Sequence, residues 1–300
     1  EFVVQNIAGQ IKNSAIAEMA LFYRTNAQSR VFEDLLLAYR IPYVIYGGIS
    51  FYQRREVKDI LAYLRLLVND SDYISFTRII NLPRRGLGAA AVEKIMAAVS
   101  EGNISLLQIC LQPQALNLSQ RQTQNLMTFA QMLIRLKKMA SQMPLPDLLT
   151  ETLEATCYLE HLKEDPENFE ERKENIDELI AKAADFEENH PEPSLRNFLE
   201  ELALFSSTQE MQTKKPHLKL MTLHNSKGLE FTIVYMTGME EDVFPHVNSR
   251  ESLPALEEER RLCYVGMTRA KKLLFLTGAK CRFLWGGLRF LRPSRFLKEI

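Results

Sequence analysis

Arg269 is the residue of this sequence whose surroundings most directly suggest chemistry. It lies in the stretch EEERRLCYVGMTRAKKLLFL, residues 257–276. The three glutamates at its start follow Pro254 and predict the N-terminus of a helix, where anions are favoured, and the lysines at 271–272 predict its C-terminus. The apolar residues 273–276 predict a short buried strand. An arginine at such a corner can pair with a nearby carboxylate, or it can bind a phosphate group.

The polar loop in LMTLHNSKGLEF, residues 220–231, follows a predicted strand. Ligands of open α/β sheets bind outside the carboxyl ends of the strands, where we expect this loop to lie. Gly228 would let a ligand approach the backbone closely, and Glu230 could accept hydrogen bonds from a sugar hydroxyl. Taken alone, the loop is explained more simply as an ordinary connection with a solvated His224 and Lys227.

Two glycines, Gly86 and Gly88, stand before an alanine-rich segment in PRRGLGAAAVEKI, residues 83–95. Arg84 and Arg85 precede them. The free N–H groups at the start of the predicted helix would suit a backbone phosphate. A tight turn between two helices explains the same pattern equally well.

Hydrogen-bond donors are dense in LFYRTNAQSR, residues 21–30. Arg24, Thr25 and Asn26 lie where a predicted strand ends, so we place them at the carboxyl edge of a sheet. The alternative is that the polar residues cap the next helix, through Asn26 or Ser29.

The composition is that of a soluble globular protein, with 46% hydrophobic and 25% charged residues, and 300 residues are enough for two domains. The sequence contains no apolar run long enough to cross a bilayer and opens with no secretory signal. Because it begins with Glu1 rather than Met, we expect a piece of a longer protein. Its four cysteines form no CxxC pair, which favours reduced thiols in a cytoplasmic protein over a disulfide frame or a metal site.

Charge is distributed unevenly although the net charge is only −1. Residues 271–298 contain eight Lys or Arg and no Asp or Glu, and aromatic residues are interleaved with them. Residues 147–201, in contrast, are rich in acidic residues. The asymmetry favours a local polyanion-binding face. A C-terminal tail with aromatic residues in the core and solvated bases explains it equally well.

Strand-like and helix-like patterns divide the chain into α/β ends and a helical middle. Strands are predicted at residues 19–25, 42–47, 217–223, 232–238 and 273–278. Between the second and third of these, nearly every segment has apolar residues at helical spacing. The simplest topology is one α/β domain that is interrupted by a large helical insertion.

Taken together and in this order, the motifs resemble the C-terminal half of superfamily 1 DNA helicases of the UvrD, PcrA and Rep type. The resemblance covers essentially the whole chain and rests on YRTNAQSR, YGGISFYQRREVKDILAYLRL, NLPRRGLG, LMTLHNSKGLEF, GMEEDVFP, EEERRLCYVGMTRAKK and RPSRFL. It implies a RecA-like motor domain of the P-loop NTPase type, called 2A, with a large all-helical insertion domain, 2B. By position, 2A would comprise residues 1–47 and 214–300, and 2B would comprise residues 48–213.

The resemblance implies nucleotide-binding roles for three of the residues above. Arg269 would reach across the cleft between two motor domains to the γ-phosphate of ATP. There a guanidinium stabilises the charge of phosphoryl transfer by bidentate hydrogen bonds, which a lysine cannot do. Glu230 would hold the ribose of the nucleotide, close to Gly228. His224 would link the nucleotide cleft to single-stranded DNA.

DNA contacts are implied for three further segments. Residues 24–26 match a segment that contacts the single strand. Residues 84–88 match a glycine turn that grips the backbone of the duplex. Trp285 stands where the family usually has Tyr or Phe, at the tip of a hairpin predicted with strands at residues 281–284 and 288–291. It would stack on the first base pair of a fork. The alternative is that the side chain packs onto the 2A sheet, since a lone tryptophan is usually highly buried.

The sequence has no Gly-Lys dipeptide and hence no phosphate-binding loop of the form G-x-x-x-x-G-K-[ST]. The family's Mg²⁺-binding and water-activating motif is absent too. The resemblance therefore implies that ATP with Mg²⁺ is bound mainly by N-terminal motor domains of the same protein, and that this chain is inactive alone.

The implied function is that of an ATP-dependent 3′-to-5′ DNA helicase in repair or replication, which translocates on single-stranded DNA and acts at single-strand/duplex junctions. No membrane partner is expected. One alternative is the helicase subunit of a helicase-nuclease. Another is a non-catalytic DNA-binding or partner-docking module, against which the intact Arg269 and Glu230 argue.

Overall fold

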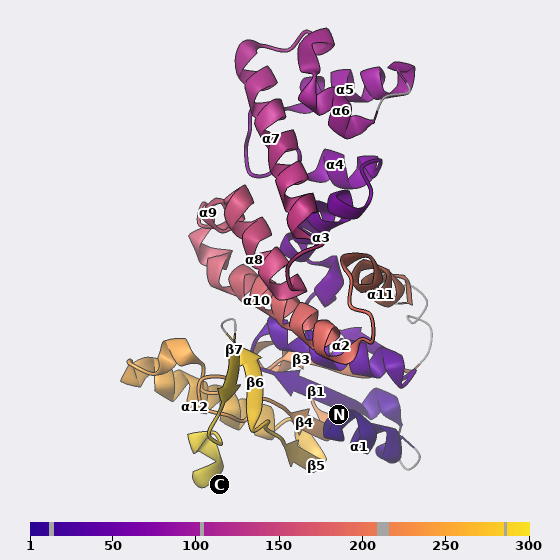
Figure 1. The fold of residues 1–300 in the computed structure, drawn as a ribbon. Coiled ribbons are helices and arrows are strands. Elements are labelled where there is room, and N and C mark those ends of the chain that lie inside the picture. Colours follow the sequence, from indigo (N-terminus) through magenta and orange to yellow (C-terminus); the bar gives the residue numbers. More distant parts are fainter. Residues whose placement is uncertain (12–14, 103–104, 209–215, 285–286) are drawn as a thin grey trace. The chain divides into compact units, whose positions relative to one another are not determined.

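The computed structural model describes the chain except for residues 12–14, 103–104, 209–215 and 285–286 (Figure 1). The chain forms two compact units. The first, which we call the α/β unit, comprises Glu1–Arg54 and Leu204–Ile300, and the second, the helical unit, comprises Arg55–Ala203. The α/β unit is thus built from both ends of the sequence.

A five-stranded parallel sheet forms the centre of the α/β unit, with strand order β2-β3-β1-β4-β5 (Figure 1). The strands are β1 Met19–Tyr23, β2 Tyr43–Ile45, β3 Leu218–Thr222, β4 Phe231–Met236 and β5 Ala270–Leu276. The central strand β1 is buried along its whole length, as the apolar run MALFY predicts for a strand that is covered on both faces. The sheet brings together segments from the two ends of the chain.

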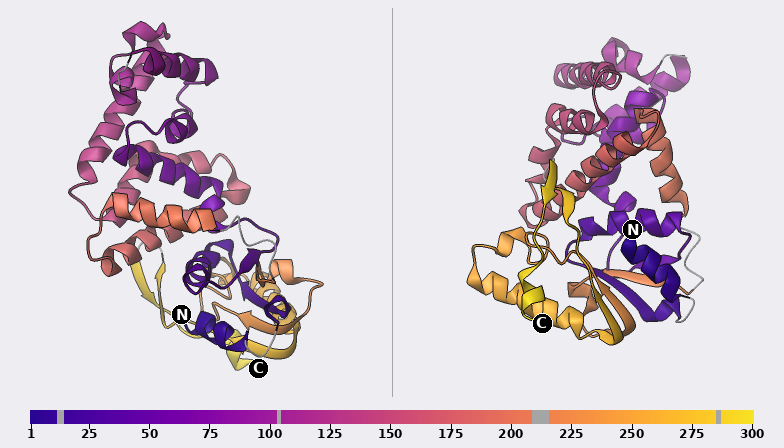
Figure 2. Two further views of the ribbon diagram at one scale, coloured as in Figure 1. Left: turned by 90° about the vertical axis from the view of Figure 1, so that its right-hand side faces the viewer. Right: turned by 60° about the horizontal axis from the view of Figure 1, so that its bottom comes forward.

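Helices cover both faces of this sheet (Figure 2). Helices α1 (Phe2–Gln10) and α2 (Ser29–Ala38) pack on one face, and α12 (Leu253–Met267) packs on the other. Alternate residues of β1 point to opposite faces, so Leu21 belongs to the first apolar core and Phe22 to the second.

A two-stranded antiparallel hairpin follows the sheet, formed by β6 (Cys281–Leu284) and β7 (Gly287–Phe290). Its Arg282 donates two hydrogen bonds to the buried carboxylate of Glu240, at 2.7 and 3.0 Å. The hairpin is therefore anchored to the α/β unit through one of its arginines.

The helical unit consists of helices joined by short turns. They are α3 Arg55–Val68, α4 Tyr73–Ile79, α5 Ala89–Gly102, α6 Leu106–Leu111, α7 Gln120–Met139, α8 Leu145–Thr156, α9 Tyr158–Leu162, α10 Pro166–Asn189 and α11 Leu195–Thr208, whose last residues belong to the α/β unit. Short 3-10 turns complete the chain: η1 Ile16–Glu18, η2 Asn26–Gln28, η3 Phe51–Gln53, η4 Pro113–Leu116, η6 His224–Ser226, η7 Val247–Ser249 and η8 Arg295–Lys298. Ser105 and Ser119 begin α6 and α7 with capping boxes.

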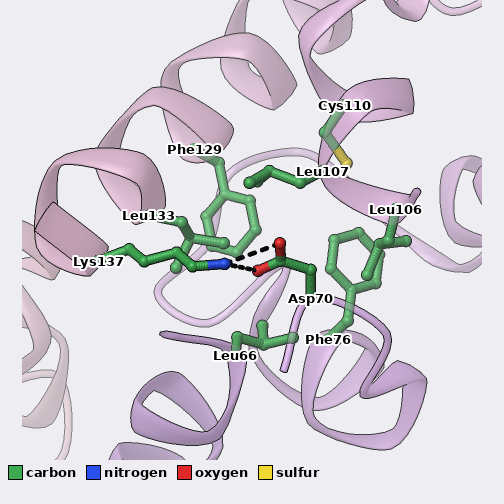
Figure 3. Close-up of a pocket in the computed structure, with 9 residues that line it drawn as sticks. All are labelled: Leu66, Asp70, Phe76, Leu106, Leu107, Cys110, Phe129, Leu133 and Lys137. Carbon is green, nitrogen blue, oxygen red and sulfur yellow. Dashed lines mark hydrogen bonds and ion pairs between the residues drawn. The ribbon is translucent and has the colours of Figure 1, made fainter. Parts of the chain in front are cut away.

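A small apolar cavity lies between helices of this unit (Figure 3). Its volume is about 10 Å³, which is room for roughly one water molecule. Lys137 and Asp70 form an ion pair beside it, with Nζ–Oδ distances of 2.7 and 2.8 Å. The cavity is too small for an organic ligand.

The observed units differ from the predicted domains at both boundaries. The predicted insertion, residues 48–213, is longer than the helical unit, residues 55–203. Residues 51–54 remain with the α/β unit because the Phe51 N–H donates to Glu33 at 3.1 Å and the Arg54 guanidinium donates to Asn26 O at 2.9 Å. These hydrogen bonds join main-chain and side-chain groups of distant residues, and no sequence pattern predicts them.

Three predictions about residues 257–276 were wrong. Helix α12 begins at Leu253 because Ser252 caps it, so the three glutamates lie beyond its first turn. The lysines at 271–272 lie in β5, which starts three residues after the helix ends. Finally, β5 is not buried: Leu273 is 44% exposed and Leu274 is 37% exposed, because among the described strands β5 pairs with β4 alone.

Candidate functional site

Arg269 connects the end of α12 to the start of β5, and its guanidinium is held in place by three hydrogen bonds. Nε donates to Val265 O at 3.0 Å, Nη1 donates to Leu229 O at 3.2 Å, and Nη2 donates to Thr268 Oγ1 at 2.9 Å. None of these acceptors is charged, and no carboxylate pairs with Arg269 among the described residues. Its positive charge is therefore oriented by the protein but is not neutralised by it.

Glu230 lies at the same edge of the sheet as Arg269. It immediately precedes β4, as Arg269 precedes β5, and the Phe231 N–H donates to Arg269 O at 2.9 Å. The Glu230 carboxylate is exposed and lies 3.5 Å from Lys271 Nζ. The prediction that this part of the loop lies at the carboxyl edge was wrong, because residues 223–230 return along the sheet to the amino edge.

Gly228 lies within this return segment and has a φ of +83°, in the region that favours glycine. No heavy atom lies within 4 Å of the position that a Cβ would take there. The backbone at Gly228 is therefore open to a ligand, as expected from the sequence.

The carboxyl edge of the sheet holds four further predicted residues. Arg24, Thr25 and Asn26 follow β1, and His224 follows the neighbouring strand β3. Thr25 caps the 3-10 turn through a capping box with Gln28, so the cap is neither of the two residues that we considered. The sheet therefore separates the predicted residues into an amino-edge group and a carboxyl-edge group.

Arg24 does not point freely away from this edge but forms a fork with Glu259 of α12. Its Nε lies 2.9 and 3.0 Å from the two carboxylate oxygens, and its Nη2 lies 2.6 Å from Oε1. The Glu259 side chain is 7% exposed, and it also accepts the His246 N–H at 3.0 Å. The carboxyl edge is thus connected to α12, the helix that precedes Arg269.

The role of Glu259 as the ion-pair partner of Arg24 was not predicted from the sequence. Its neighbours Glu257 and Glu258 pair with arginines on the surface of α12. The available signal was helical spacing: Glu259 lies three residues after Leu256 and three before Leu262, which are both core residues. A carboxylate on the apolar side of a helix needs a partner, and here the partner is Arg24.

His224 has a lowered pKa, first because it is partly desolvated and next because the Arg24 charge is near. Its imidazole is therefore neutral at pH 7. The adjacent Asn225 donates its side-chain N–H to Gly47 O at 3.2 Å. A Cβ at Gly47 would lie 2.6 Å from this side chain, so glycine is required at a position that we had not singled out.

The glycine turn in the helical unit is built around Arg85, whose guanidinium points inward. It donates to Ile79 O at 3.0 Å and to Tyr63 Oη at 2.8 Å, and it lies 4.9 Å from the centre of the Phe129 ring. Asn81 Oδ1 accepts the Arg85 N–H at 2.7 Å. Arg85 therefore holds the turn together from inside.

Arg84, Gly86 and Gly88 form the outer side of this turn and are all exposed. Gly86 has a φ of +70°, whereas Gly88 is outside the positive-φ region. No heavy atom lies within 4 Å of a Cβ built at either glycine. Helix α5 begins directly after Gly88, so its first N–H groups lie beside an exposed backbone and an arginine.

Trp285 lies outside the described residues, as does Gly286. The strands on either side are paired, with Arg282 opposite Arg289 and Leu284 opposite Gly287. The second strand begins at Gly287, one residue earlier than predicted. The hairpin itself is therefore confirmed from its two strands.

Two other features are absent from the described residues. In the part of the chain that the structure describes, no group of three or more His, Cys, Asp or Glu side chains is arranged to hold a metal ion. No helix built from the described residues combines the length and the apolar character needed to cross a membrane.

Comparison with known proteins identifies the family of the chain. ATP-dependent DNA helicase PcrA of Staphylococcus epidermidis is 42% identical over 306 aligned positions, and PcrA of Staphylococcus aureus is 41% identical over the same length. Each alignment covers all of this chain but only 42% of the relative. Residues 1–281 match the family described as the UvrD-like helicase C-terminal domain. The chain belongs to this family.

Proposed function

We propose that this chain is the C-terminal part of an ATP-dependent 3′-to-5′ DNA helicase. In this proposal the α/β unit is the RecA-like motor domain 2A, and the helical unit is the insertion domain 2B. The observation that carries the proposal is the oriented, unneutralised guanidinium of Arg269 at the amino edge of the sheet, with Glu230 on the neighbouring strand. Such a guanidinium is suited to a phosphate that another domain supplies.

The amino-edge group would complete a nucleotide site. ATP with Mg²⁺ would be held mainly by the N-terminal motor domains, and Arg269 would stabilise the charge that develops on the γ-phosphate. Its bonds to two carbonyl groups fix the direction of the guanidinium before the nucleotide binds. Glu230 would exchange its weak contact with Lys271 for a ribose hydroxyl, and the open backbone at Gly228 would allow close approach.

The carboxyl-edge group would contact single-stranded DNA. Thr25 and Asn26 would supply hydrogen-bonding groups, while the Arg24 guanidinium, which is occupied by Glu259, would hold the segment in position. His224 would act as a neutral imidazole that can donate a hydrogen bond or stack on a base. Because α12 joins Glu259 to Arg269, the two groups are connected through one helix.

The helical unit would grip the duplex through its glycine turn. The exposed backbone at Gly86 and Gly88, the start of α5 and the side chain of Arg84 would contact phosphates without reading the bases. Arg85 would support the turn from inside. Trp285, which follows β6 in the sequence, would stack on the first base pair of the fork.

Replacing Gly88 with valine tests the grip on the duplex. We expect binding to a tailed duplex to weaken by about tenfold or more, the value of one hydrogen bond to a charged group, because the side chain would block a phosphate. Binding to single strands should not change. Gly88 is preferable to Gly86 because its φ is not positive, so the turn itself is not strained.

Gly9→Val is the matched control, since Gly9 is exposed in α1 and also has open space around its Cβ position. It should leave both affinities unchanged. Equal weakening on the two DNA substrates by Gly88→Val would show instead that the turn is only structural.

Strand displacement by the parent protein tests the proposed function. With ATP and Mg²⁺ the parent should separate a tailed duplex, and no separation should occur without ATP. The 300-residue chain alone should hydrolyse no ATP, because it contains no phosphate-binding loop. A parent protein that binds the tailed duplex and hydrolyses ATP without separating the strands would contradict the proposal.

A further inference from the structure

The outer edge of β5 is unusual for a strand with this sequence. The run LLFL, residues 273–276, predicts a buried strand, yet Leu273 is 44% exposed and Leu274 is 37% exposed. Consecutive residues of a strand point to opposite faces, so apolar surface is uncovered on both sides of the sheet. A β5 that had a neighbour on its outer side would have the burial that its sequence predicts.

The crossovers of the sheet indicate where a further strand would lie. Helix α2 connects β1 to β2 across one face, and α12 connects β4 to β5 across the other face in the opposite direction along the sheet. The two crossovers therefore have the same hand. Crossovers between parallel strands are right-handed in about 98% of cases.

Helix α1 lies on the same face as α2, since Val4 and Ile7 pack in the same apolar core as Leu36. It also reaches over β4, where the Tyr235 hydroxyl donates to Asn6 Oδ1 at 2.7 Å. Because α1 leads into β1 from the α2 face, a parallel strand before it must lie on the β5 side of β1. The positions of β4 and β5 are filled, so the first open position is beyond β5.

We propose that the outer edge of β5 pairs in parallel with an extended segment of the parent protein that directly precedes α1, as a sixth strand of the sheet. The curated relatives are long enough to supply it, because this chain covers only 42% of their length. The segment should be apolar on both faces, to cover Leu273 and Leu274. The inference depends on the topology and not on helicase activity.

Such a strand would also restrict the motion of Arg269. The arginine immediately precedes β5, and among the described strands β5 pairs with β4 alone, through contacts that include the Phe231 N–H to Arg269 O bond. Pairing on the outer side would fix β5 from both sides. The N-terminal part of the parent would thereby be joined to the strand that positions the guanidinium.

Hydrogen exchange of the parent protein tests whether this edge is paired. We expect the outward-facing amides of β5 to exchange at least about tenfold more slowly than those of β2, the strand at the other edge. Equal, fast exchange at the two edges would overturn the proposal.

Cysteine cross-linking identifies the partner. In a parent whose exposed Cys157 and Cys281 are replaced by serine, Leu273→Cys is combined with single cysteines at each of the ten or so residues before Glu1. Disulfides should form at alternate positions of that segment, the period of a strand, and the control Val44→Cys in β2 should form none with it. Cross-linking of Leu273→Cys to a second copy of the protein, or the absence of any cross-link with the segment, would overturn the proposal.

Discussion

Replacing Arg269 with alanine is expected to lower DNA-stimulated ATP hydrolysis by the parent protein by a factor of about 10³ or more. The guanidinium would stabilise charge that spreads over the γ-phosphate oxygens in the transition state, and no carboxylate among the described residues neutralises it beforehand. Because the interaction belongs to the transition state, the turnover number should fall rather than the affinity for ATP.

Two further variants separate this role from a general effect of charge or stability. Arg269→Lys keeps the charge but lacks the planar fork, so it should remain strongly impaired. Arg261→Ala removes an arginine of the preceding helix α12 that is 70% exposed and pairs with Glu258 on the surface, and it should leave turnover unchanged. Wild-type turnover in Arg269→Ala would refute the assignment, provided that circular dichroism shows an unchanged fold.

Replacing Glu259 with alanine is expected to destabilise the α/β unit by about 3 kcal/mol, the lower end of the cost of breaking a buried ion pair. The lower end applies because Arg24 keeps 20% of its side chain exposed. The variant leaves the Arg24 guanidinium without its carboxylate and removes the acceptor of the His246 N–H. The shift in the urea midpoint measures the destabilisation.

Glu258→Ala is the matched control, because Glu258 is the preceding residue of the same helix but is 70% exposed. Surface ion pairs contribute about 0–1 kcal/mol, so this variant should hardly move the urea midpoint. An equally small shift for Glu259→Ala would mean that the fork with Arg24 contributes little to stability.

The same ion pair bears on how Arg24 contributes to DNA binding. Log affinity falls as log salt rises, and the slope is negative. Removing one cationic side chain that binds a phosphate of single-stranded DNA reduces the magnitude of this slope by about 0.7. We expect Arg24→Gln to leave this slope unchanged, since three hydrogen bonds already direct the guanidinium to Glu259. A slope whose magnitude is smaller by about 0.7 in this variant would show that Arg24 leaves Glu259 and binds a phosphate directly.

The fold could be predicted from the sequence wherever one segment carries its own signal. The apolar run of β1 and the return of strand patterns after residue 216 were enough to indicate an α/β unit interrupted by helices. The Arg24–Glu259 pair could not be predicted in this way, because its partners are 235 positions apart. The helical spacing of Glu259 indicates that it needs a partner, but not which residue that partner is. Long-range polar pairing follows from packing, which single segments do not specify.

Several details of the candidate site also could not be predicted from single segments of the sequence. Arg84 and Arg85 are adjacent and of one type, yet one is exposed and the other fills the space beside Phe129. Which of two neighbours turns inward depends on the aromatic rings supplied by α3 and α7. The exposure of β5 was missed for a related reason, since its apolar sequence is correct for a strand with two neighbours.

The most direct test of the account is strand displacement by the parent protein on two duplexes that differ only in the polarity of a single-stranded tail. With ATP and Mg²⁺, we expect the duplex with a 3′ tail to be separated and the duplex with a 5′ tail to remain intact, and we expect Arg269→Ala to separate neither. Equal separation of both duplexes would contradict the direction of movement. Separation by Arg269→Ala at the wild-type rate would contradict the central claim, that this chain supplies the arginine that completes the ATP site.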